Sequence, residues 1–514
     1  MSKTYYITTP IYYPNGEPHL GHYYCTVCTD VLARFHMLCG EETHFLTGTD
    51  EHGVKMVKTA IALNTDPATL ADVNSQIFRD LWKEMGICNT DYIRTTEPRH
   101  KQSVQEIICR MLANGDSYLG SYEGWYDEGQ EEFVTETEAK LREYKSAISG
   151  RELTRYQEHS YFFRLSKYAP LVLKYVEEHP DFVQPDSRRN EVLSKLKAGV
   201  DDLSISRATL KWGIQMPNDP EHVVYVWIDA LSNYITALGF GSAKDDLYRK
   251  FWPGVHIIGK EILWFHAVYW PAMLMSLGEP LPQQIFAHGW WTSEGKKMSK
   301  SMGNFIDLTK IRHMASTYSG DALRYYMIRA ASFGADLDWT DNDFHKSFNE
   351  LANVLGNCLN RTIKMIGKYC DGKIPAAQSQ LEGIDQALVE KTAALGQQVR
   401  EAYLRYDLQG AAMLSIDLAR QTNGYIDATE PFKLAKDPAK AERLATVLNL
   451  AAQAIARSLV ALIPVLPEKA REGLAQLNLD LSGKDYDQLM NSPLPVGHAL
   501  GEGKPLFPKV DLPT

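Results

Sequence analysis

The sequence predicts an α/β fold, in which a parallel β-sheet is interrupted by an inserted domain and followed by a C-terminal α-helical bundle. Three observations predict this organisation. Short β-rich segments alternate with helical patterns up to about residue 115 and again from about residue 223. Residues 116–222 between these blocks are polar, turn-rich and acidic in the stretch YEGWYDEGQEEF. From about residue 346 onward only helical patterns follow.

The first block, residues 1–115, contains the clearest alternation. A loop from Pro10 to Pro18, with the turn signal Asn15-Gly16, separates the first strand from the first helix. The expected elements are, in order, a strand at 4–9, a helix from Leu20 to Leu38 with Gly40 past its end, a strand at 44–50, helices at 54–63 and 70–85, a strand at 92–96 and a helix at 99–114. Such alternation is typical of βαβ units, and therefore of a parallel sheet.

The second α/β block, residues 223–292, is expected to complete the same sheet. Its strands are expected at 223–228, 255–259 and 284–292, with a helix beginning at about Glu261. Residues 293–345 then lead to the helical part, residues 346–514. Within that part, apolar residues from Leu444 to Leu462 recur at i, i+3 and i+4, as in an amphipathic helix that faces a core.

Composition and charge exclude several classes of protein. The chain has 514 residues and a formal net charge of −10, which argues against a nonspecific nucleic-acid binder. Residues 346–514 contain 19 Lys/Arg and 19 Asp/Glu, so any RNA contact there is expected to be specific. No apolar run reaches the roughly 18 residues of a membrane span, and the N-terminus shows no targeting pattern.

The cysteines favour a reducing, cytoplasmic location. There are seven of them, an odd number, and they are widely spread along the chain. Cys25 and Cys28 form a C-x-x-C pattern inside a predicted helix, with no second pair nearby. Because zinc sites need four ligands, we expect ordinary buried thiols here rather than a redox or zinc site.

Two histidines mark the first candidate site. His19 and His22, in PNGEPHLGHYY, share one face of the first turn of the helix after the first strand. At the carboxyl edge of a doubly wound sheet, a helix N-terminus offers free N–H groups and partial positive charge. Gly21 between the histidines allows close approach to the backbone. This pattern favours a bound triphosphate, although a helix start with two structural histidines would look the same.

A second candidate phosphate-binding segment is KMSKS at 297–301, between Gly295 and Gly303. Lys297 and Lys300 would supply point charges on flexible stems, and the serines would supply hydroxyl donors. Such a loop can close over phosphates and open afterwards. Taken alone, the segment would be read as a solvated basic loop.

Together the two motifs resemble the paired signatures of class I aminoacyl-tRNA synthetases. The segments TTPIYYPNGEPHLGH, FLTGTDEHG, VYVWIDALSNY, IIGKEILWFHAVYWPAML, FAHGWW and KKMSKSMGN resemble the methionyl-tRNA synthetase family in this order, over most of the first 310 residues. The resemblance implies a Rossmann-like catalytic domain. It also implies that His19, His22, Lys297 and Lys300 are catalytic and neutralise phosphate charge on ATP. The further ATP contacts that it implies are Gly21, Gly259, Lys260, Glu261 on the ribose, Met298, Ser299 and Ser301.

The resemblance also implies a methionine pocket, and residue spacing agrees with one. Ile262, His266 and Trp270 recur at i, i+4 and i+8 on one predicted helix, with Phe265 beside them. Aromatic walls suit a polarisable thioether, although such stripes are more often ordinary core. By family analogy, Asp50 holds the α-ammonium, Ile11 and Tyr13 close the site, and Tyr234 and His266 lie near the sulfur. The remaining expected pocket residues are Trp227, Ala230 and Leu231.

In the helical part, the family analogy assigns Asn357 and Arg361 to reading of the CAU anticodon. Amide and guanidinium groups can hydrogen-bond unstacked base edges, although helix-surface polar residues would give the same pattern. Phe432 stands where the family usually has a tryptophan that stacks on an anticodon base, and Phe stacks with less area.

The inserted segment departs from many relatives, in which cysteine pairs form a zinc knuckle. Asp127 and Gln130 stand where cysteines would be sought, so no structural zinc and no protein metal site are expected. The chain is therefore similar to the bacterial or organellar type that lacks those cysteines.

The predicted reaction is ATP- and Mg²⁺-dependent ligation of L-methionine to tRNA(Met), including initiator tRNA, through a methionyl-adenylate. We expect a cytoplasmic protein with no membrane contact. We also expect a monomer, because the length leaves no room for an appended tRNA-binding module after the bundle. Alternatives are a class I synthetase for Leu, Ile, Val or Cys, a small-molecule nucleotidyltransferase, and a non-catalytic tRNA-binding protein. An insertion of about 105 residues is too short for the editing module of the first three enzymes, and the cysteine enzyme usually relies on zinc thiolates. A nucleotidyltransferase would not need the bundle, and a non-catalytic protein would be expected to lose the motif residues.

Overall fold

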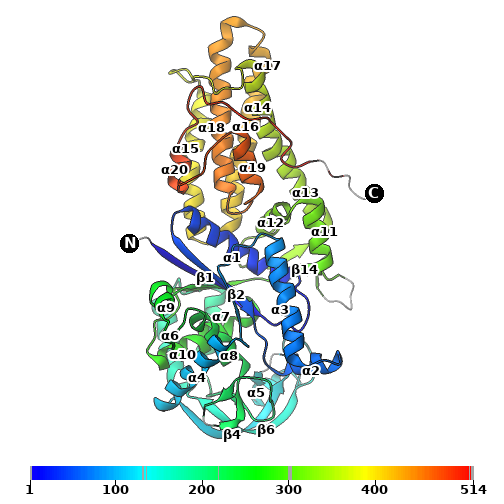
Figure 1. Cartoon of the computed structure of the whole chain (residues 1–514), viewed down its shortest axis with the longest axis vertical. Helices are drawn as coiled ribbons and strands as arrows, with labels where there is room; N and C mark the ends of the chain where they lie inside the picture. Colours follow the sequence, from blue (N-terminus) through cyan, green and yellow to red (C-terminus); the bar gives the residue numbers. More distant parts are fainter. Residues whose placement is uncertain are drawn as a thin grey trace. The chain divides into compact units, whose positions relative to one another are not determined.

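The computed structural model describes residues 3–129, 132–134, 136–217, 219–298, 304–508 and 510. The chain divides into two compact units, drawn in Figure 1 and described separately below. The first, here called the sheet unit, comprises Thr4–Thr29 and Thr43–His288. The second, here called the bundle unit, comprises Met1–Lys3, Asp30–Glu42 and Gly289–Thr514.

A six-stranded sheet forms the core of the sheet unit, with strand order β3-β2-β1-β12-β13-β7. Its strands are β1 (Thr4–Tyr12), β2 (Glu42–Thr49), β3 (Asp91–Arg94), β7 (Val183–Gln184), β12 (Val255–Gly259) and β13 (Gln284–His288). The pairs β2–β3, β1–β12, β12–β13 and β13–β7 are parallel. The predicted parallel sheet is therefore confirmed, and the short β7 from the inserted segment adds an unpredicted edge strand.

The strand order reverses between β1 and β12. From β1 the chain proceeds outward through β2 and β3, whereas β12 and β13 extend the sheet on the other side. The β1–β12 register pairs Ile7 with Val255 and Thr8 with His256. Both strands therefore end at the same edge of the sheet. In doubly wound folds the crevice at such a switch point is where ligands bind.

Helices follow most of these strands, as the sequence predicts. They are α1 (Leu20–Leu38), α2 (Val54–Ala62), α3 (Pro67–Glu84), α4 (Pro98–Ala113), α6 (Leu165–Glu178), α7 (Asp186–Lys197), α8 (Val226–Thr236), α9 (Asp246–Phe251) and α10 (Trp270–Leu277). The start of α3 illustrates the local cause: Asp66 accepts the N–H groups of Ala68 and Thr69, and Pro67 occupies the first turn. The bounds of α1 match the prediction, and its residues from Asp30 onward belong to the bundle unit.

The inserted segment forms two small antiparallel sheets. One contains β5 (Glu132–Val134), β4 (Ser117–Asp127), β6 (Thr154–Phe163) and β8 (Leu203–Ser204), with α5 (Glu136–Leu141) nearby in sequence. The other contains β10 (Gln215–Met216), β11 (Asp219–Val224) and β9 (Ser206–Arg207).

The strand predicted at 223–228 as part of the central sheet is wrong. Only its first two residues lie in a strand, β11, which pairs with β9 and β10 instead. The remainder begins α8, a helix in which ten of eleven residues are buried. A short apolar run fits a buried helix as well as a buried strand, so its periodicity could not separate the two.

The bundle unit begins with a separate three-stranded sheet of β14 (Trp291–Ser293), β15 (Lys296–Lys297) and β16 (Leu337–Trp339). The single strand predicted at 284–292 is therefore wrong, because it divides into β13 and β14. The strand is interrupted at Gly289, where an added Cβ would lie 2.1 Å from the carbonyl oxygen of Ala335. Only glycine allows that close approach.

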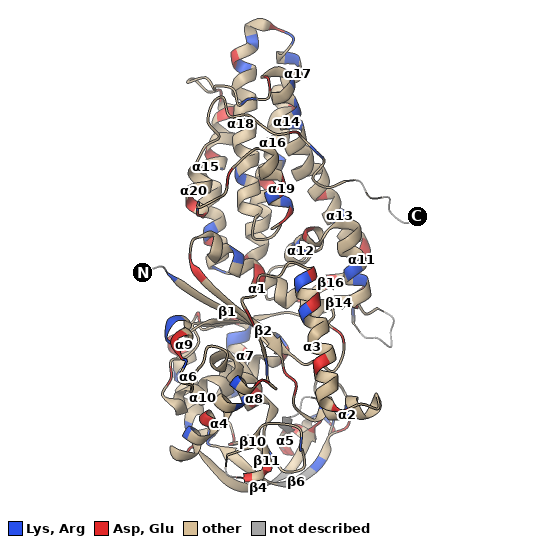
Figure 2. Cartoon of the chain, in the orientation of Figure 1, with Lys and Arg blue, Asp and Glu red and all other residues tan. Residues whose placement is uncertain are grey.

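Helices make up most of the bundle unit. They are α11 (Leu308–Tyr318), α12 (Gly320–Arg329), α13 (Asp341–Glu350), α14 (Asn357–Tyr369), α15 (Gly383–Leu404), α16 (Leu408–Thr429), α17 (Pro431–Leu434), α18 (Ala441–Leu462), α19 (Lys469–Gln476) and α20 (Tyr486–Asn491), with a π-helical turn η4 (Leu351–Gly356) before α14. Helices α15, α16 and α18 pack on one another. Figure 2 shows charges of both signs along these helices rather than a basic blanket, as the sequence predicts.

Among the described residues, one helical stretch, Pro438–Leu462, is long and apolar enough to cross a membrane by length and composition. Its most apolar window is 78% buried within the protein, as in the core helix of a soluble bundle. The stretch therefore gives only weak support for a membrane span.

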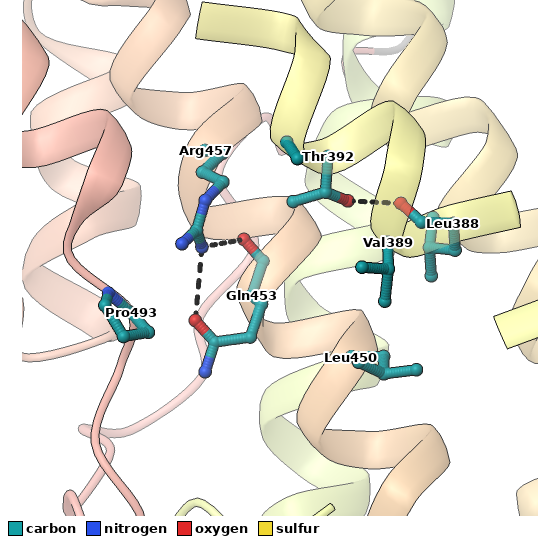
Figure 3. Close-up of a pocket in the computed structure, with 8 residues that line it drawn as sticks. Leu388, Val389, Thr392, Leu450, Gln453, Arg457 and Pro493 are labelled. Carbon is teal, nitrogen blue, oxygen red and sulfur yellow. Dashed lines mark hydrogen bonds between the residues drawn. The ribbon is translucent and has the colours of Figure 1, made fainter. Parts of the chain in front are cut away.

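A pocket of about 190 Å³ lies between α15, α18 and Pro493 (Figure 3). Its walls are mostly apolar, and Arg457 lies at its side with its guanidinium bonded to Gln453. The pocket contains none of the residues predicted to bind methionine or ATP.

A buried ion pair joins elements of the bundle unit that are far apart in sequence. Arg324 of α12 places Nη2 2.6 Å from Oδ2 of Asp30, and both side chains are almost fully buried. The same guanidinium donates to the carbonyl oxygens of Pro464 and Val465, each at 3.1 Å. Asp30 has a second partner in Arg34 at 2.7 Å.

We predict that Arg324→Ala lowers the free energy of unfolding by about 3 kcal/mol, because it leaves a buried carboxylate short of one partner. Urea denaturation followed by circular dichroism would measure the change. Lys346→Ala, which removes an exposed pair with Asp343, is the control and should have little effect. Equal losses in the two variants would contradict this role for Arg324.

Candidate active site

His19 and His22 lie where β1 gives way to α1, at the switch point of the sheet. Their rings stack with centroids 3.8 Å apart. Nδ1 of His22 accepts the backbone N–H of His19 at 3.3 Å, and Nδ1 of His19 accepts that of Gly21 at 3.1 Å. Because Nδ1 is an acceptor in both rings, each ring carries its proton on Nε2 and can donate it to a ligand.

His22 is neutral at pH 7. Burial, followed by the proximity of His19, lowers the pKa of His22 well below its usual range. Its ring packs against Tyr12 and Phe78, with centroids 4.9 Å and 5.3 Å away. In the free protein His22 is therefore a neutral hydrogen-bond donor, and its expected role in neutralising phosphate charge stays a prediction.

Gly21 allows a close approach between the start of α1 and the ring of His19. An added Cβ would lie 3.0 Å from Cε1 and 3.2 Å from Nδ1 of His19. The group that approaches the Gly21 backbone in the free protein is thus the His19 ring itself. Glycine allows that ring to fold over the start of α1.

Gly259, Lys260 and Glu261 lie at the end of the neighbouring strand β12. Lys260 and Glu261 begin a 3₁₀ turn, η1 (Lys260–Ile262), directly after Gly259. The Glu261 carboxylate folds back over the glycine, since an added Cβ on Gly259 would lie 2.5 Å from Oε1. An exposed carboxylate is thereby held at the sheet edge where β1 and β12 both end, a position suited to a ribose.

The expected sulfur-binding pair is in contact. The hydroxyl of Tyr234 lies 2.7 Å from Nε2 of His266, and Nδ1 of His266 lies 2.9 Å from the carbonyl oxygen of Ile262. A carbonyl only accepts, so Nδ1 carries the proton and Nε2 accepts from Tyr234. Burial lowers the pKa of His266 to about 4, which keeps the ring neutral.

Aromatic side chains form the rest of this cluster. Trp227 and Phe265 stack face to face, with centroids 3.8 Å apart and an interplanar angle of 4°. Tyr234 lies 5.7 Å from His266 and 6.0 Å from Trp270, measured between ring centroids. The helix that carries these residues is less regular than predicted, because a π-helical turn η2 (Phe265–Tyr269) precedes α10. Ala230 and Leu231 are buried on α8.

The loops after β1 and β2 meet beside this cluster of elements. The N–H of Asp50 donates to the carbonyl oxygen of Tyr12 at 2.9 Å, and the hydroxyl of Tyr13 donates to that of His52 at 2.6 Å. Asp50 is buried, and Ile11 is half-buried near the end of β1. The structure thus brings Ile11, Tyr13 and Asp50 to one edge of the sheet.

Comparison with known proteins identifies the family. Residues 5–140 and 137–363 match the family described as tRNA synthetases class I (M). The chain is 45% identical to a methionine–tRNA ligase of Caldanaerobacter subterraneus subsp. tengcongensis, with 100% of this chain and 80% of that protein covered.

The chain belongs to the methionyl-tRNA synthetase family of class I. Its enzyme class, ligase, follows from that membership. The ligase of Bacillus subtilis is 43% identical, over 99% of this chain and 78% of that protein.

Solved structures from Mycobacterium tuberculosis agree with this membership. Its methionyl-tRNA synthetase in complex with methionyl-adenylate matches with a TM-score of 0.95 at 38% identity, covering 99% of this chain and 100% of that chain. The free-state form matches with a TM-score of 0.88 at 35% identity, covering 100% and 99%. The Rossmann-like catalytic fold with an added helical part is therefore confirmed.

The KMSKS motif of the family lies mostly outside the described residues. Ser299, Lys300 and Ser301 are not described, and of Lys297 only the backbone is, in β15. β14 and β15 form a hairpin whose turn residues, Glu294 and Gly295, both have positive φ. Met298 follows the hairpin and is half-buried. The approach of these lysines to ATP stays a prediction.

The expected anticodon residues lie in the bundle unit. Asn357 is exposed at the start of α14, and Arg361 follows one turn later with Nη2 2.6 Å from Oδ1 of Asp427. Phe432, in α17, is 45% exposed, which is unusual for a large aromatic side chain. This ion pair is partly exposed to solvent, so it contributes little to stability, and the anticodon role of Arg361 stays a prediction.

The expected absence of zinc stays a prediction. Within the part of the chain that the structure describes, no group of three or more His, Cys, Asp or Glu is arranged to hold a metal. Asp127 accepts the N–H of Gly129 at 2.8 Å as a turn residue, and Gln130 lies outside the described residues. Cys25 and Cys28 are buried free thiols, as predicted, and burial raises the pKa of Cys25 to about 12.

The sequence did not reveal a buried polar network that adjoins this site. His52 and His100 each bond to a different carboxylate oxygen of Asp229, although the three residues lie in separate segments. No spacing rule connects such residues. The one available signal was charge: an aspartate within the apolar run VYVWIDAL must have partners if it is buried.

We predict that Gly259→Ala raises the KM for ATP by about tenfold, because the new methyl group displaces the Glu261 carboxylate from its hydrogen-bonding position. The φ of −73° at Gly259 is compatible with alanine, so backbone strain does not confuse the result. Steady-state ATP–pyrophosphate exchange would measure it.

The matched control is Gly367→Ala in α14, where an added Cβ meets nothing within 4 Å. This variant should keep the parental KM for ATP. An unchanged KM in Gly259→Ala would contradict the placement of Glu261 on the nucleotide.

Proposed function

We propose that this chain ligates L-methionine to tRNA(Met), including initiator tRNA, through a methionyl-adenylate, with release of pyrophosphate and AMP. The observation that carries the proposal is the switch point between β1 and β12. The turn after β1 presents His19 and His22, and the turn after β12 presents Glu261. A family relative bound to methionyl-adenylate supports the same chemistry.

In the first step the methionine carboxylate attacks the α-phosphorus of ATP. The carboxylate is already ionised at pH 7, so no general base is needed. The chain's contribution is positioning and electrostatic stabilisation. His19 and His22 donate Nε2–H to phosphate oxygens, while Lys297 and Lys300 supply the positive charge that the neutral histidine lacks.

The triphosphate itself provides the oxygen ligands that Mg²⁺ prefers. When bound, the ion would offset negative charge on the phosphates. Gly21, Gly259, Lys260, Met298, Ser299 and Ser301 complete the proposed nucleotide site.

Selection of methionine rests on a neutral pocket with one charged end. Asp50 accepts the α-ammonium, beside Ile11 and Tyr13. Tyr234 already donates to neutral His266, so the pocket has little to offer a charged or strongly polar side chain. Its aromatic walls favour a polarisable sulfur. The wall residues are Trp227, Ala230, Leu231, Ile262, Phe265 and Trp270.

In the second step a ribose hydroxyl of the terminal adenosine of tRNA attacks the methionyl carbonyl, and AMP leaves. Asn357 and Arg361 read anticodon bases, and exposed Phe432 stacks on one. We propose that the enzyme acts as a cytoplasmic monomer without membrane contact. The free thiols suit that reducing compartment.

The proposed division of labour keeps the five segments inferred from the sequence. Residues 1–115 and 223–292 form the catalytic domain, and residues 116–222 form the connective domain. Residues 293–345 carry KMSKS and contact the tRNA stem, and residues 346–514 bind the anticodon. The separate antiparallel sheets of the inserted segment support the second of these assignments.

ATP–pyrophosphate exchange measured with each of the twenty standard amino acids would test the proposed function. Methionine alone should support exchange at low concentration. Trp270→Ala should then raise the KM for methionine while leaving the KM for ATP near the parental value. Exchange driven best by leucine, isoleucine, valine or cysteine would contradict the assignment.

Lys300→Ala should raise the activation free energy of adenylate formation by about 3 kcal/mol, because a charge contact to the departing pyrophosphate is lost. The rate should fall on the order of a hundredfold. Methionine affinity should not change. Lys296→Ala removes an exposed lysine of the hairpin that precedes Lys300 in sequence and serves as the control. Exchange by Lys300→Ala at the rate of the control would refute the role of this lysine.

A further inference from the structure

A fully buried carboxylate lies within the helix that carries half of the methionine pocket. Asp229 of α8 has no exposed surface. Its Oδ2 lies 2.6 Å from Nδ1 of His52, and its Oδ1 lies 2.7 Å from Nε2 of His100. On its far side His100 places Nδ1 2.7 Å from Oγ1 of Thr236. Each carboxylate oxygen therefore has its own imidazole partner.

The carboxylate keeps its charge despite its burial. Burial alone would raise the pKa of Asp229, but His52 and His100 outweigh that effect and bring the pKa down to about 2. Removing one partner from a buried charge is costly, so the carboxylate holds both rings firmly. A pair of this kind contributes a fixed geometry more clearly than it contributes net stability.

The network joins three segments of the sheet unit. His52 lies in the loop after β2, His100 lies in the first turn of α4, and Asp229 lies in α8 between the pocket residues Trp227 and Ala230. Trp227 and Ala230 are thereby carried on the same helical turn as the carboxylate. The β2 loop and the pocket helix are thus joined through one buried side chain.

The loop after β2 is also fixed at Glu51, the residue between Asp50 and His52. Glu51 accepts two hydrogen bonds from Arg94, at 2.6 Å and 3.0 Å. The indole of Trp212 donates to the carbonyl oxygen of Glu51 at 2.6 Å. Tyr13 donates to the carbonyl oxygen of His52. Glu51 and His52, the two residues after Asp50, are therefore each held both at the side chain and at the carbonyl group.

We propose that Asp229, His52 and His100 act as positioning residues that set the distance between the ammonium-binding carboxylate of Asp50 and the thioether pocket on α8. This inference rests on the proposed function, because it requires that Asp50 hold the α-ammonium. We call these three residues the clamp. By fixing the distance between the positions of the ammonium group and the sulfur, the clamp favours an α-amino acid of methionine's length.

A purely structural network would behave differently. A general loss of packing would weaken the binding of every pocket ligand to the same extent, or would lower the stability of the protein without changing its selectivity. A clamp on the Asp50 loop must instead reduce the advantage of ligands that carry the α-ammonium. The informative quantity is therefore a ratio: the affinity for L-methionine divided by that for 4-(methylthio)butanoate, which lacks the amine.

The experiment measures both ligands by isothermal titration on the full chain, for the parent, His52→Ala, His52→Asn and Asp50→Asn. Asparagine can replace the Nδ1–H donor of His52, so it should restore most of the ratio. His52→Ala should reduce the ratio by about tenfold, with little change for the ligand that lacks the amine. The KM for ATP should stay near the parental value.

His100→Gln supplies a second variant in case His52→Ala does not fold, since a glutamine amide can donate to Oδ1 of Asp229 while losing the bond to Thr236. It should give a smaller reduction in the ratio. A parental ratio in both His52→Ala and His100→Gln, beside a collapsed ratio in Asp50→Asn, would overturn the clamp alone. A parental ratio in Asp50→Asn would overturn the ammonium assignment, and the clamp with it.

Discussion

The parallel pairing of β1 with β12 is the constraint on which the site depends. Ile7 lies opposite Val255 and Thr8 opposite His256, so strands about 250 residues apart in sequence end side by side. Every insertion between them must leave this register intact. Because the strand order reverses at this pair, the turn that carries His19 and His22 and the turn that carries Glu261 open onto the same crevice.

The same pairing positions the proposed methionine pocket through buried, neutral imidazoles. The indole N–H of Trp270 lies 3.2 Å from Nε2 of His256, whose Nδ1 lies 2.9 Å from Oγ1 of Thr8. Burial lowers the pKa of His256 well below its usual range, as it does that of His266. Tyr234 stacks on His256, with centroids 4.0 Å apart. Neutral rings thus orient this aromatic cluster by hydrogen bonds, whereas the buried carboxylates Asp50, Glu51 and Asp229 lie in the loop after β2 and in α8.

Local patterns predicted the elements whose signals are local. The helix from Leu20 to Leu38 and the strand from 255 to 259 were predicted with their observed bounds, because caps, glycines and periodicity mark them in sequence. The division at Gly289 and the antiparallel partners of β11 were missed, because they depend on close approaches between distant segments. For the same reason no pattern announced that His52 and His100 converge on Asp229. The resemblance to a family supplied Asp50, Asn357 and Arg361, whose roles no spacing rule could have assigned.

The most direct measurement is a crystal structure of the chain with a non-hydrolysable methionyl-adenylate analogue. We predict that the analogue occupies the crevice at the ends of β1 and β12. Its ammonium should lie on Asp50, its ribose on Glu261 and its sulfur beside Tyr234 and His266. An analogue bound elsewhere, for example in the pocket beside Arg457, with the β1–β12 crevice empty, would contradict it.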